Sequence, residues 1–310
     1  MSVTLIAVVV ALVLGHLAPA LAAAVRNFGW YADWLRWLGA RLPAVSVWSG
    51  RWGIGLALAP PVIAVALFQL ALHEPLYGLA GLLFGVAVLF YAWGPRDLDV
   101  DVDAVADAPE PLSRRAAAAR LWPDDTAASL DAGALIGAVA GSALRRWFGV
   151  LFWFLLLGPA GALLYRLTAL SAHGNATVLP SDNAAGAKVL LSILDWPVAQ
   201  LMTLSLALVG NFDTVLAAWR DAGGASFNLD NRYLAAAARA SVRVELAEDA
   251  DDAADGIIHV PLGSGAAGTP APLIAMPEMP ELRDALSLVW RSLLVWLAVL
   301  ALFVISGWVS

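Results

Sequence analysis

Two ionisable side chains stand in or directly beside apolar segments of this 310-residue chain, where a charge is costly unless it is paired or hydrated. Arg166 directly follows a mostly apolar run that is about as long as the 20 residues a helix needs to cross a bilayer. Asp195 lies inside a second apolar segment, 186–210. A carboxylate and a guanidinium in contact offset each other's loss of hydration, so we expect Arg166 and Asp195 to be partners.

Further arginines and polar residues precede these two and complete a candidate binding site. Arginine recognises carboxylate and phosphate groups through two parallel hydrogen bonds, so an anionic small molecule is the expected ligand. The alternative is that the same arginines anchor helix ends and form ion pairs within the protein. The candidate ligand-binding residues are Arg96, Asp97, Arg145, Arg146, Tyr165, Arg166 and Asp195.

The composition indicates an integral membrane protein. Hydrophobic residues make up 61% of the chain and charged residues 14%, and the mean hydropathy is +0.76. Soluble domains carry about 25% charged residues. The lipid bilayer is therefore an expected partner. The net charge of −7 argues against a nucleic-acid partner, which needs a clustered basic surface. The chain has no cysteine, which excludes disulfides and thiolate chemistry.

The apolar segments predict an all-α fold, a multi-pass bundle of about four to six membrane helices with cytosolic helical loops, forming a single domain over 1–310. Gly158-Pro159 leaves open a second interpretation, in which the chain turns back as a re-entrant hairpin. The predicted membrane helices are 3–24, 52–72, 76–93, 147–170, 186–210 and 286–308, and the polar cytosolic segments are 94–146 and 211–285.

Two polar elements are also predicted to be helical. Segment 26–51 alternates tryptophans with arginines, which is typical of a helix lying at the membrane interface. Within 127–145, a predicted cytosolic helix, Gly133, Gly137 and Gly141 recur every four residues. Glycine disfavours helix, so we expect a closely packed neighbour on that face.

Three further motifs have more ordinary explanations. Asp99, Asp101, Asp103 and Glu110 fall at ligand positions of a calcium loop, but Ala104 stands where the turn requires glycine, so an exposed acidic face is expected. The G-x-G-x-x-G run 263–268 is flanked by prolines and not by a strand and a helix, which favours a linker over a nucleotide loop. His16 is expected to be a packed or partly hydrated side chain.

Several short motifs resemble one membrane family, which contains the AmpE signalling proteins and the CobD/CbiB cobinamide synthases. The resemblance covers residues 90–220 best and rests on the order and spacing of the motifs. They are Gly94-Pro95-Arg96-Asp97-Leu98, Leu151-Phe152-Trp153, Gly158-Pro159-Ala160-Gly161-Ala162, Tyr165-Arg166 and Leu194-Asp195-Trp196-Pro197.

The departures from the synthase pattern favour the AmpE branch. Before the Phe-Trp pair the synthases carry Glu-Ser-Leu-Ala-Glu-Asn and then Asp-Gly, whereas this chain has 137–142 without acids and then Arg145-Arg146. The resemblance then implies an inner-membrane modulator of β-lactamase induction, with a functional link to a cell-wall amidase of the AmpD type. On this interpretation the chain is not an enzyme and has no catalytic residue, metal ligand or cofactor.

The alternative is a membrane-bound ATP-dependent amide synthase of the CobD/CbiB type. In that case Asp125, Asp195 and the region of Asp255 would supply metal ligands. A transporter fits less well, because no inverted repeat with paired broken helices is evident.

The distribution of arginine predicts the topology. Segments 26–51, 94–146 and 211–291 hold four, six and six arginines, and the 73–75 link holds none. The positive-inside rule therefore places the three arginine-rich segments in the cytosol.

Reporter fusions test this topology. A reporter that is active in the periplasm should be active when fused at Glu74, and a reporter that is active in the cytosol should be active when fused at Asp252. Activity of the periplasmic reporter at Asp252 would contradict the prediction.

Overall fold

The computed structural model describes residues 2–17, 24–42, 47–72, 78–94, 97–123, 128–226, 229–255 and 279–306. Every regular element in these ranges is helical, so the predicted all-α class is confirmed. In chain order the elements are α1 (Ser2–Leu17), α3 (Gly29–Arg41), η1 (Val47–Ser49), α4 (Ile54–Ala71), α5 (Gly78–Ala92), α6 (Leu98–Ala106), α7 (Pro111–Ala118), η3 (Ala119–Leu121), α8 (Ala132–Ala143), η4 (Leu144–Phe148), α9 (Gly149–Leu157), α10 (Pro159–Ala172), α11 (Ser181–Val209), α12 (Phe212–Asp221), α13 (Arg232–Asp255) and α14 (Pro280–Ile305).

Four helices of the described part are long and apolar enough to cross a membrane: α4, the continuous helix Ala132–Leu157, α11 and α14. Leu5–Gly15 in α1 and the whole of α5 are shorter apolar helices. The outer face of α4 carries exposed apolar side chains. Leu67, Phe68 and Leu70 are each more than 60% exposed. Such a surface is stable in lipid and would aggregate in water. The protein is therefore a helical membrane protein.

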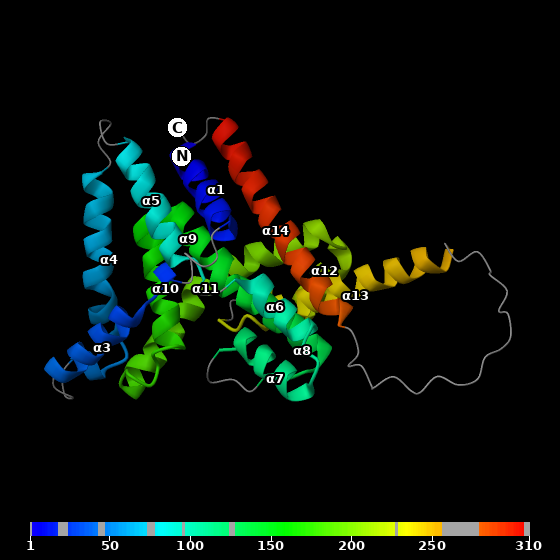
Figure 1. The fold of residues 1–310 in the computed structure, drawn as a ribbon, viewed down its shortest axis with the longest axis horizontal. Coiled ribbons are helices and arrows are strands. Elements are labelled where there is room, and N and C mark those ends of the chain that lie inside the picture. The colour runs from blue at the N-terminus through cyan, green and yellow to red at the C-terminus, as the bar shows by residue number, and fades with distance from the viewer. Residues whose placement is uncertain are drawn as a thin grey trace.

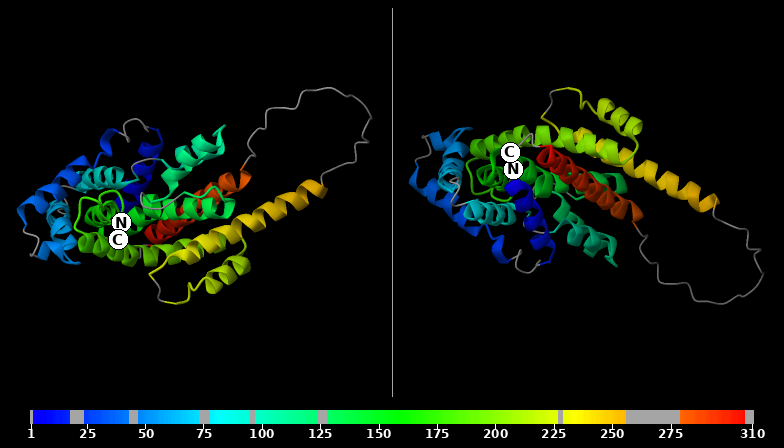
Figure 2. Two further views of the ribbon diagram at one scale, coloured as in Figure 1. Left: turned by 90° about the horizontal axis from the view of Figure 1, so that it is seen from below. Right: turned by 90° about the horizontal axis from the view of Figure 1, so that it is seen from above.

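The helices form two connected groups (Figure 1). α4 and α5 stand side by side at one edge, α1 packs on α5, and α10 packs against both α4 and α5. α3 crosses the lower end of α4. α6, α7, α8 and α13 gather on the other side, where α13 extends away from the bundle (Figures 1 and 2). α14 slants between the groups and contacts α1, α8 and α11.

The expected membrane helix over 147–170 is two helices, α9 and α10, joined at Gly158. Gly158 has φ +71°, a backbone conformation that a residue with a Cβ rarely adopts. The amide of Gln69 on α4 donates to the Leu157 carbonyl at 3.2 Å, and its oxygen accepts from the Ala160 N–H at 3.2 Å. Gln69 thus satisfies the backbone groups that the turn leaves without helical partners.

α10 folds back antiparallel on α9. A Cβ built on Gly149 would overlap the ring of Tyr165, and one built on Gly161 would overlap the Trp153 carbonyl. These two pairs, 149 with 165 and 153 with 161, define the register of the hairpin. Both glycines are therefore required for the close approach of the two helices.

The expected cytosolic helix over 127–145 is the first part of the long apolar helix Ala132–Leu157. The predicted boundary between the cytosolic segment 94–146 and the membrane helix 147–170 falls inside this helix. The boundary was misplaced because paired arginines, such as Arg145 and Arg146, usually mark the end of a membrane helix. The prediction of a close neighbour for the glycine face is confirmed. A Cβ on Gly137 would lie 3.0 Å from the Cβ of Ala235 on α13.

The interfacial helix is found as predicted, whereas the acidic segment differs from its prediction. α3 buries Tyr31, Leu35 and Leu38 and exposes Trp30 and Trp37, as expected for an interfacial helix. The expected acidic loop is instead helical: α6 runs through the aspartates from 99 to 103, which excludes the calcium-loop geometry, and one of these side chains is buried. Residues 263–268 and the side chain of His16 lie outside the described part.

Substitution Gly149→Ala tests the register of the hairpin. The added methyl group would overlap the buried Tyr165 ring, so we expect the protein in detergent to lose about 1–3 kcal/mol of unfolding free energy, the usual effect of overpacking. Gly55→Ala on α4 is the matched control, because a Cβ there meets no atom within 4 Å. Equal thermal stability of the two variants would contradict this packing.

Candidate functional site

A single turn of π-helix, η4, lies at the centre of the molecule and carries two of the predicted site residues, Arg145 and Arg146. Its hydrogen bonds are one residue longer than those of an α-helix; the Gly149 N–H bonds to the Leu144 carbonyl. Such turns inside α-helices occur frequently at functional sites. Here the turn exposes the Arg146 carbonyl, which accepts the Gly94 N–H at 3.2 Å and an Arg166 N–H at 3.4 Å.

The Arg146 guanidinium holds the neighbouring polar helices. It forms an ion pair with Asp101 on α6 at 2.7 Å and donates to the Arg120 carbonyl at 2.7 Å. The Asp101 side chain is fully buried. Arg145 lies alongside and donates to the Leu121 carbonyl at 3.4 Å. The two arginines therefore bind the end of η3, and one of them neutralises a buried acid.

Two other arginines bind the carboxyl end of α5. Arg166 donates to the Ala92 carbonyl at 2.6 Å, and Arg26 donates to the carbonyls of Phe90 and Gly94 at 3.0 and 3.1 Å. The last carbonyls of a helix lack backbone partners and carry partial negative charge, so arginine is favoured there. Arg166 is only 4% exposed, yet its charge lies against this helix end.

The expected partnership of Arg166 with Asp195 is replaced by another one. The Tyr165 hydroxyl donates to Asp195 Oδ1 at 2.6 Å. Tyr165 is fully buried and Asp195 is 6% exposed. The positive charge of Arg145 interacts electrostatically with this carboxylate. Tyr165 and Arg166 are neighbours on α10, and each faces a different acceptor.

These contacts define a buried polar cluster that consists of Arg145, Arg146, Tyr165, Arg166 and Asp195. The elements that position it are η4, α10 and α11. The Trp153 indole on α9 donates to the Leu194 carbonyl at 3.1 Å and so fixes α11 beside the hairpin. The cluster contains a phenol that donates to a carboxylate, with a cation nearby. That arrangement can hold or pass a proton in general acid–base chemistry.

Two groups at the margin of the cluster have shifted pKa values. Burial lowers the pKa of Arg26, and the carboxylate of Asp97 offsets part of this effect. Burial raises the pKa of Tyr233 on α13, and the negative charge of Asp195 raises it further. Tyr233 therefore stays protonated and able to donate a hydrogen bond at neutral pH.

A small pocket of about 30 Å³ lies next to the cluster, between α1, the end of α5 and α14. Arg26, Asp97, Trp147 and Trp290 are among its lining residues. The indole N–H of Trp147 is buried and has no hydrogen-bond partner among the described residues. A cavity above about 10–15 Å³ has room for a water molecule, and Arg26, Asp97 and Trp147 provide polar groups for one here. Asp97 lines this pocket, so it lies beside the cluster and not within it.

Six of the seven predicted site residues are described, and five of them form the cluster. Arg96 lies outside the described residues, as do Asp125 and the side chain of Asp255. Within the described part, no three histidine or acidic side chains come together as a metal site.

The sequence reasoning did not identify three residues that belong to this region: Arg26, Asp101 and Tyr233. The pattern of segment 26–51 predicts an interfacial helix, although Arg26 is the first cation after a long apolar helix and therefore stands close to the bundle. The acidic pattern around Asp101 predicts an exposed side chain. The spacing of Tyr233 on α13 gives no signal that it approaches Asp195.

Comparison with known proteins gives one informative similarity. The curated "Cobalamin biosynthesis protein CobD" of Stutzerimonas stutzeri (strain A1501) is 28% identical over 240 residues, which cover 74% of this chain and 74% of the relative. No protein-family model matches the chain, and no solved structure matches it. The similarity supports the superfamily resemblance on the CobD/CbiB side and gives no support to the AmpE branch.

The expectation that the protein is not an enzyme is therefore corrected. It rested on the replacement of the synthase acids by residues such as Gly137 and Arg145. The similarity to a cobalamin biosynthesis protein extends over three quarters of the chain and points to a catalytic function. Although the stretch 137–142 has no acids, carboxylates from other helices, Asp101 on α6 and Asp195 on α11, reach the centre of the bundle.

A double-mutant cycle tests the central contact of the cluster. Tyr165→Phe and Asp195→Ala should each destabilise the protein, and their effects should be coupled by about 0.5–3 kcal/mol because they remove the same hydrogen bond. Unfolding in detergent gives the energies. Tyr31→Phe, which removes a separate contact with Ser171, is the control and should add to Asp195→Ala. Additive energies for the Tyr165 pair would contradict the contact.

Proposed function

We propose that the protein is a membrane-embedded enzyme of cobalamin biosynthesis that forms an amide bond with the use of ATP, as in the CobD/CbiB synthases. The similarity to CobD supports this proposal. The observation that carries it is the buried pair Tyr165–Asp195. Both residues come from motifs that carry the family resemblance, and they meet although 30 positions separate them.

The proposed role of Asp195 is that of a general base. An amine that attacks an activated carboxyl group must lose a proton, and a positioned carboxylate can accept it. Tyr165 holds the Asp195 carboxylate in one orientation through a 2.6 Å hydrogen bond. Arg145 is partly exposed and interacts with the same carboxylate, so it links the buried base with the surface.

The anionic ligand expected at the arginines would then be the phosphate groups of the nucleotide. Arg145 and Arg146 are the partly exposed members of the cluster. Guanidinium groups bind phosphate oxygens and stabilise the charge that develops on them. The proposal assigns this role to Arg145 first, because Arg146 is already paired with Asp101.

No magnesium ligand is assigned. The described residues do not form a cluster of three acidic or histidine side chains. Magnesium often binds through one or two carboxylates together with substrate phosphates and water, an arrangement that needs no cluster of three protein ligands. Because the residues do not show where the ion would lie, no step of the proposal depends on it.

A regulatory role of the AmpE type is the second candidate. The observation that favours it is the tight packing of the segment that carries acids in the synthases: Gly137 lies against Ala235 on α13, and a Cβ on Gly141 would lie 3.3 Å from the Arg145 guanidinium. This face is filled by protein and presents no carboxylate. Such a protein would act in the inner membrane, with a functional link to an amidase of the AmpD type.

Genetic complementation separates the two candidates. In a strain that lacks its CobD/CbiB synthase, the wild-type chain should restore growth that depends on cobinamide synthesis. Asp195→Ala should abolish the rescue because the proposed base is lost. Asp33→Asn, on the exposed face of α3, is the control and should rescue like the wild type. Membrane levels of each variant are measured by immunoblot.

Failure of the wild-type chain to rescue growth, although it accumulates in the membrane at the level of the missing synthase, would contradict the enzyme proposal. Full rescue by Asp195→Ala would leave the enzyme proposal in place and contradict the role of Asp195 as the general base. In the first case, a change in β-lactamase induction on deletion of the gene would support the regulatory candidate.

A further inference from the structure

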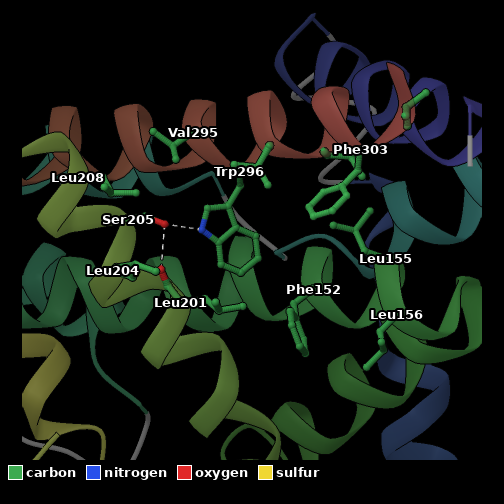
Figure 3. Close-up of a pocket in the computed structure, with 13 residues that line it drawn as sticks. Phe152, Leu155, Leu156, Leu201, Leu204, Ser205, Leu208, Val295, Trp296 and Phe303 are labelled. Atoms are coloured by element: carbon green, nitrogen blue, oxygen red, sulfur yellow. Dashed lines mark hydrogen bonds between the residues drawn. The ribbon is translucent and has the colours of Figure 1, made fainter. Parts of the chain in front are cut away.

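An apolar groove of about 400 Å³ opens between three helices of the membrane region, away from the buried polar cluster. α9, α11 and α14 form its walls, and Figure 3 shows their side chains converging on it. On α11 the lining positions recur at helical spacing, so one face of that helix forms a wall. The lining residues are Phe152, Leu155, Leu156, Leu201, Leu204, Ser205, Leu208, Val295, Trp296, Val299, Leu300, Phe303 and Val304.

The groove offers no free polar group to an occupant. Its polar side-chain atoms belong to Ser205 and Trp296. The Trp296 indole donates to the Ser205 hydroxyl at 2.7 Å, and that hydroxyl donates to the Leu201 carbonyl at 2.9 Å (Figure 3). With these groups satisfied, a ligand that needs hydrogen bonds or a counter-charge would lose its hydration without compensation. The occupant must be apolar along its length.

The groove is continuous with the apolar outer surface. Leu156 and Leu208 are each 61% exposed and Phe303 is 49% exposed, so each helix places part of its lining face outward. α11, α14 and the helix that contains α9 are three of the four described helices that are long and apolar enough to cross a membrane. The surroundings of the groove are therefore lipid hydrocarbon.

We propose that the groove binds one hydrocarbon chain of a membrane lipid. The atoms that line an empty groove lose dispersion contacts, and a hydrocarbon chain that enters the groove from the bilayer restores them. A chain on a flat helical surface touches protein on one side only, whereas a chain in this groove touches α9, α11 and α14. The additional contacts distinguish a retained lipid from the exchanging lipids around the protein. The proposal is independent of the enzymatic function.

The size of the groove favours a chain over a helix of a second copy. A helix with its side chains is about 10 Å across, which is wider than a single hydrocarbon chain, so a partner helix would pack across the mouth of the groove and leave space behind it. A flexible chain can follow its length.

The test compares two matched phenylalanine substitutions by native mass spectrometry of protein purified in mild detergent. Val299→Phe introduces a phenyl ring inside the groove, and Ile63→Phe introduces a phenyl ring on the exposed face of α4, outside it. Wild type and Ile63→Phe should retain a lipid of defined mass through detergent exchange. Val299→Phe should retain several-fold less of it.

A second measurement does not depend on the folding of Val299→Phe. Lipids with brominated chains quench tryptophan fluorescence on contact. Reconstitution into such lipids should quench the wild type more than Trp296→Phe, because Trp296 lines the groove. Equal lipid retention by the wild type, Ile63→Phe and Val299→Phe would overturn the proposal, and so would equal quenching of the wild type and Trp296→Phe. So would a wild-type dimer, shown by its mass, that dissociates on Val299→Phe, since a second copy would then cover the groove.

Discussion

The structure depends on the way in which arginine charges are accommodated inside a largely apolar bundle. The arginines at the centre of the bundle are placed against carbonyl groups that a helix end leaves without partners. Arg26 and Arg166 bind the end of α5, and Arg145 and Arg146 bind the end of η3. A buried cation and an unpaired carbonyl each destabilise a protein alone, but together they satisfy each other. The same contacts join helices that are far apart in the sequence.

The hairpin of α9 and α10 extends this arrangement to the centre of the site. Its tight turn at Gly158 is stabilised by Gln69 from another helix, and its close approach depends on glycine opposite Tyr165. With α10 held in this register, Tyr165 faces Asp195 while the next residue, Arg166, faces α5. The chemistry proposed for Asp195 thus relies on a backbone turn at the far end of α10.

Much of the fold could be predicted from the sequence. Helices α4, α11 and α14 correspond to long apolar runs, because lipid requires such runs and little else produces them. The sequence indicates the division of 147–170 at Gly158-Pro159 only as an alternative, because the turn depends on one positive φ and on Gln69, 88 positions away from Leu157. The candidate site was predicted as a set of residues, but their pairing was not. Distance along the chain gave no way to distinguish Tyr165 from Arg166 as the partner of Asp195.

The π turn of η4 also determines how the two halves of the long helix Ala132–Leu157 face their neighbours. One residue rotates a helix by about 100°, so the wider turn changes the rotational phase of α9 relative to α8. The glycine face of α8 meets α13, while Gly149 and Trp153 meet α10. Loss or gain of a single residue within Leu144–Phe148 would turn one face away from its neighbour. A change in the length of this segment would therefore disturb the packing of α8 on α13 and of α9 on α10 at the same time.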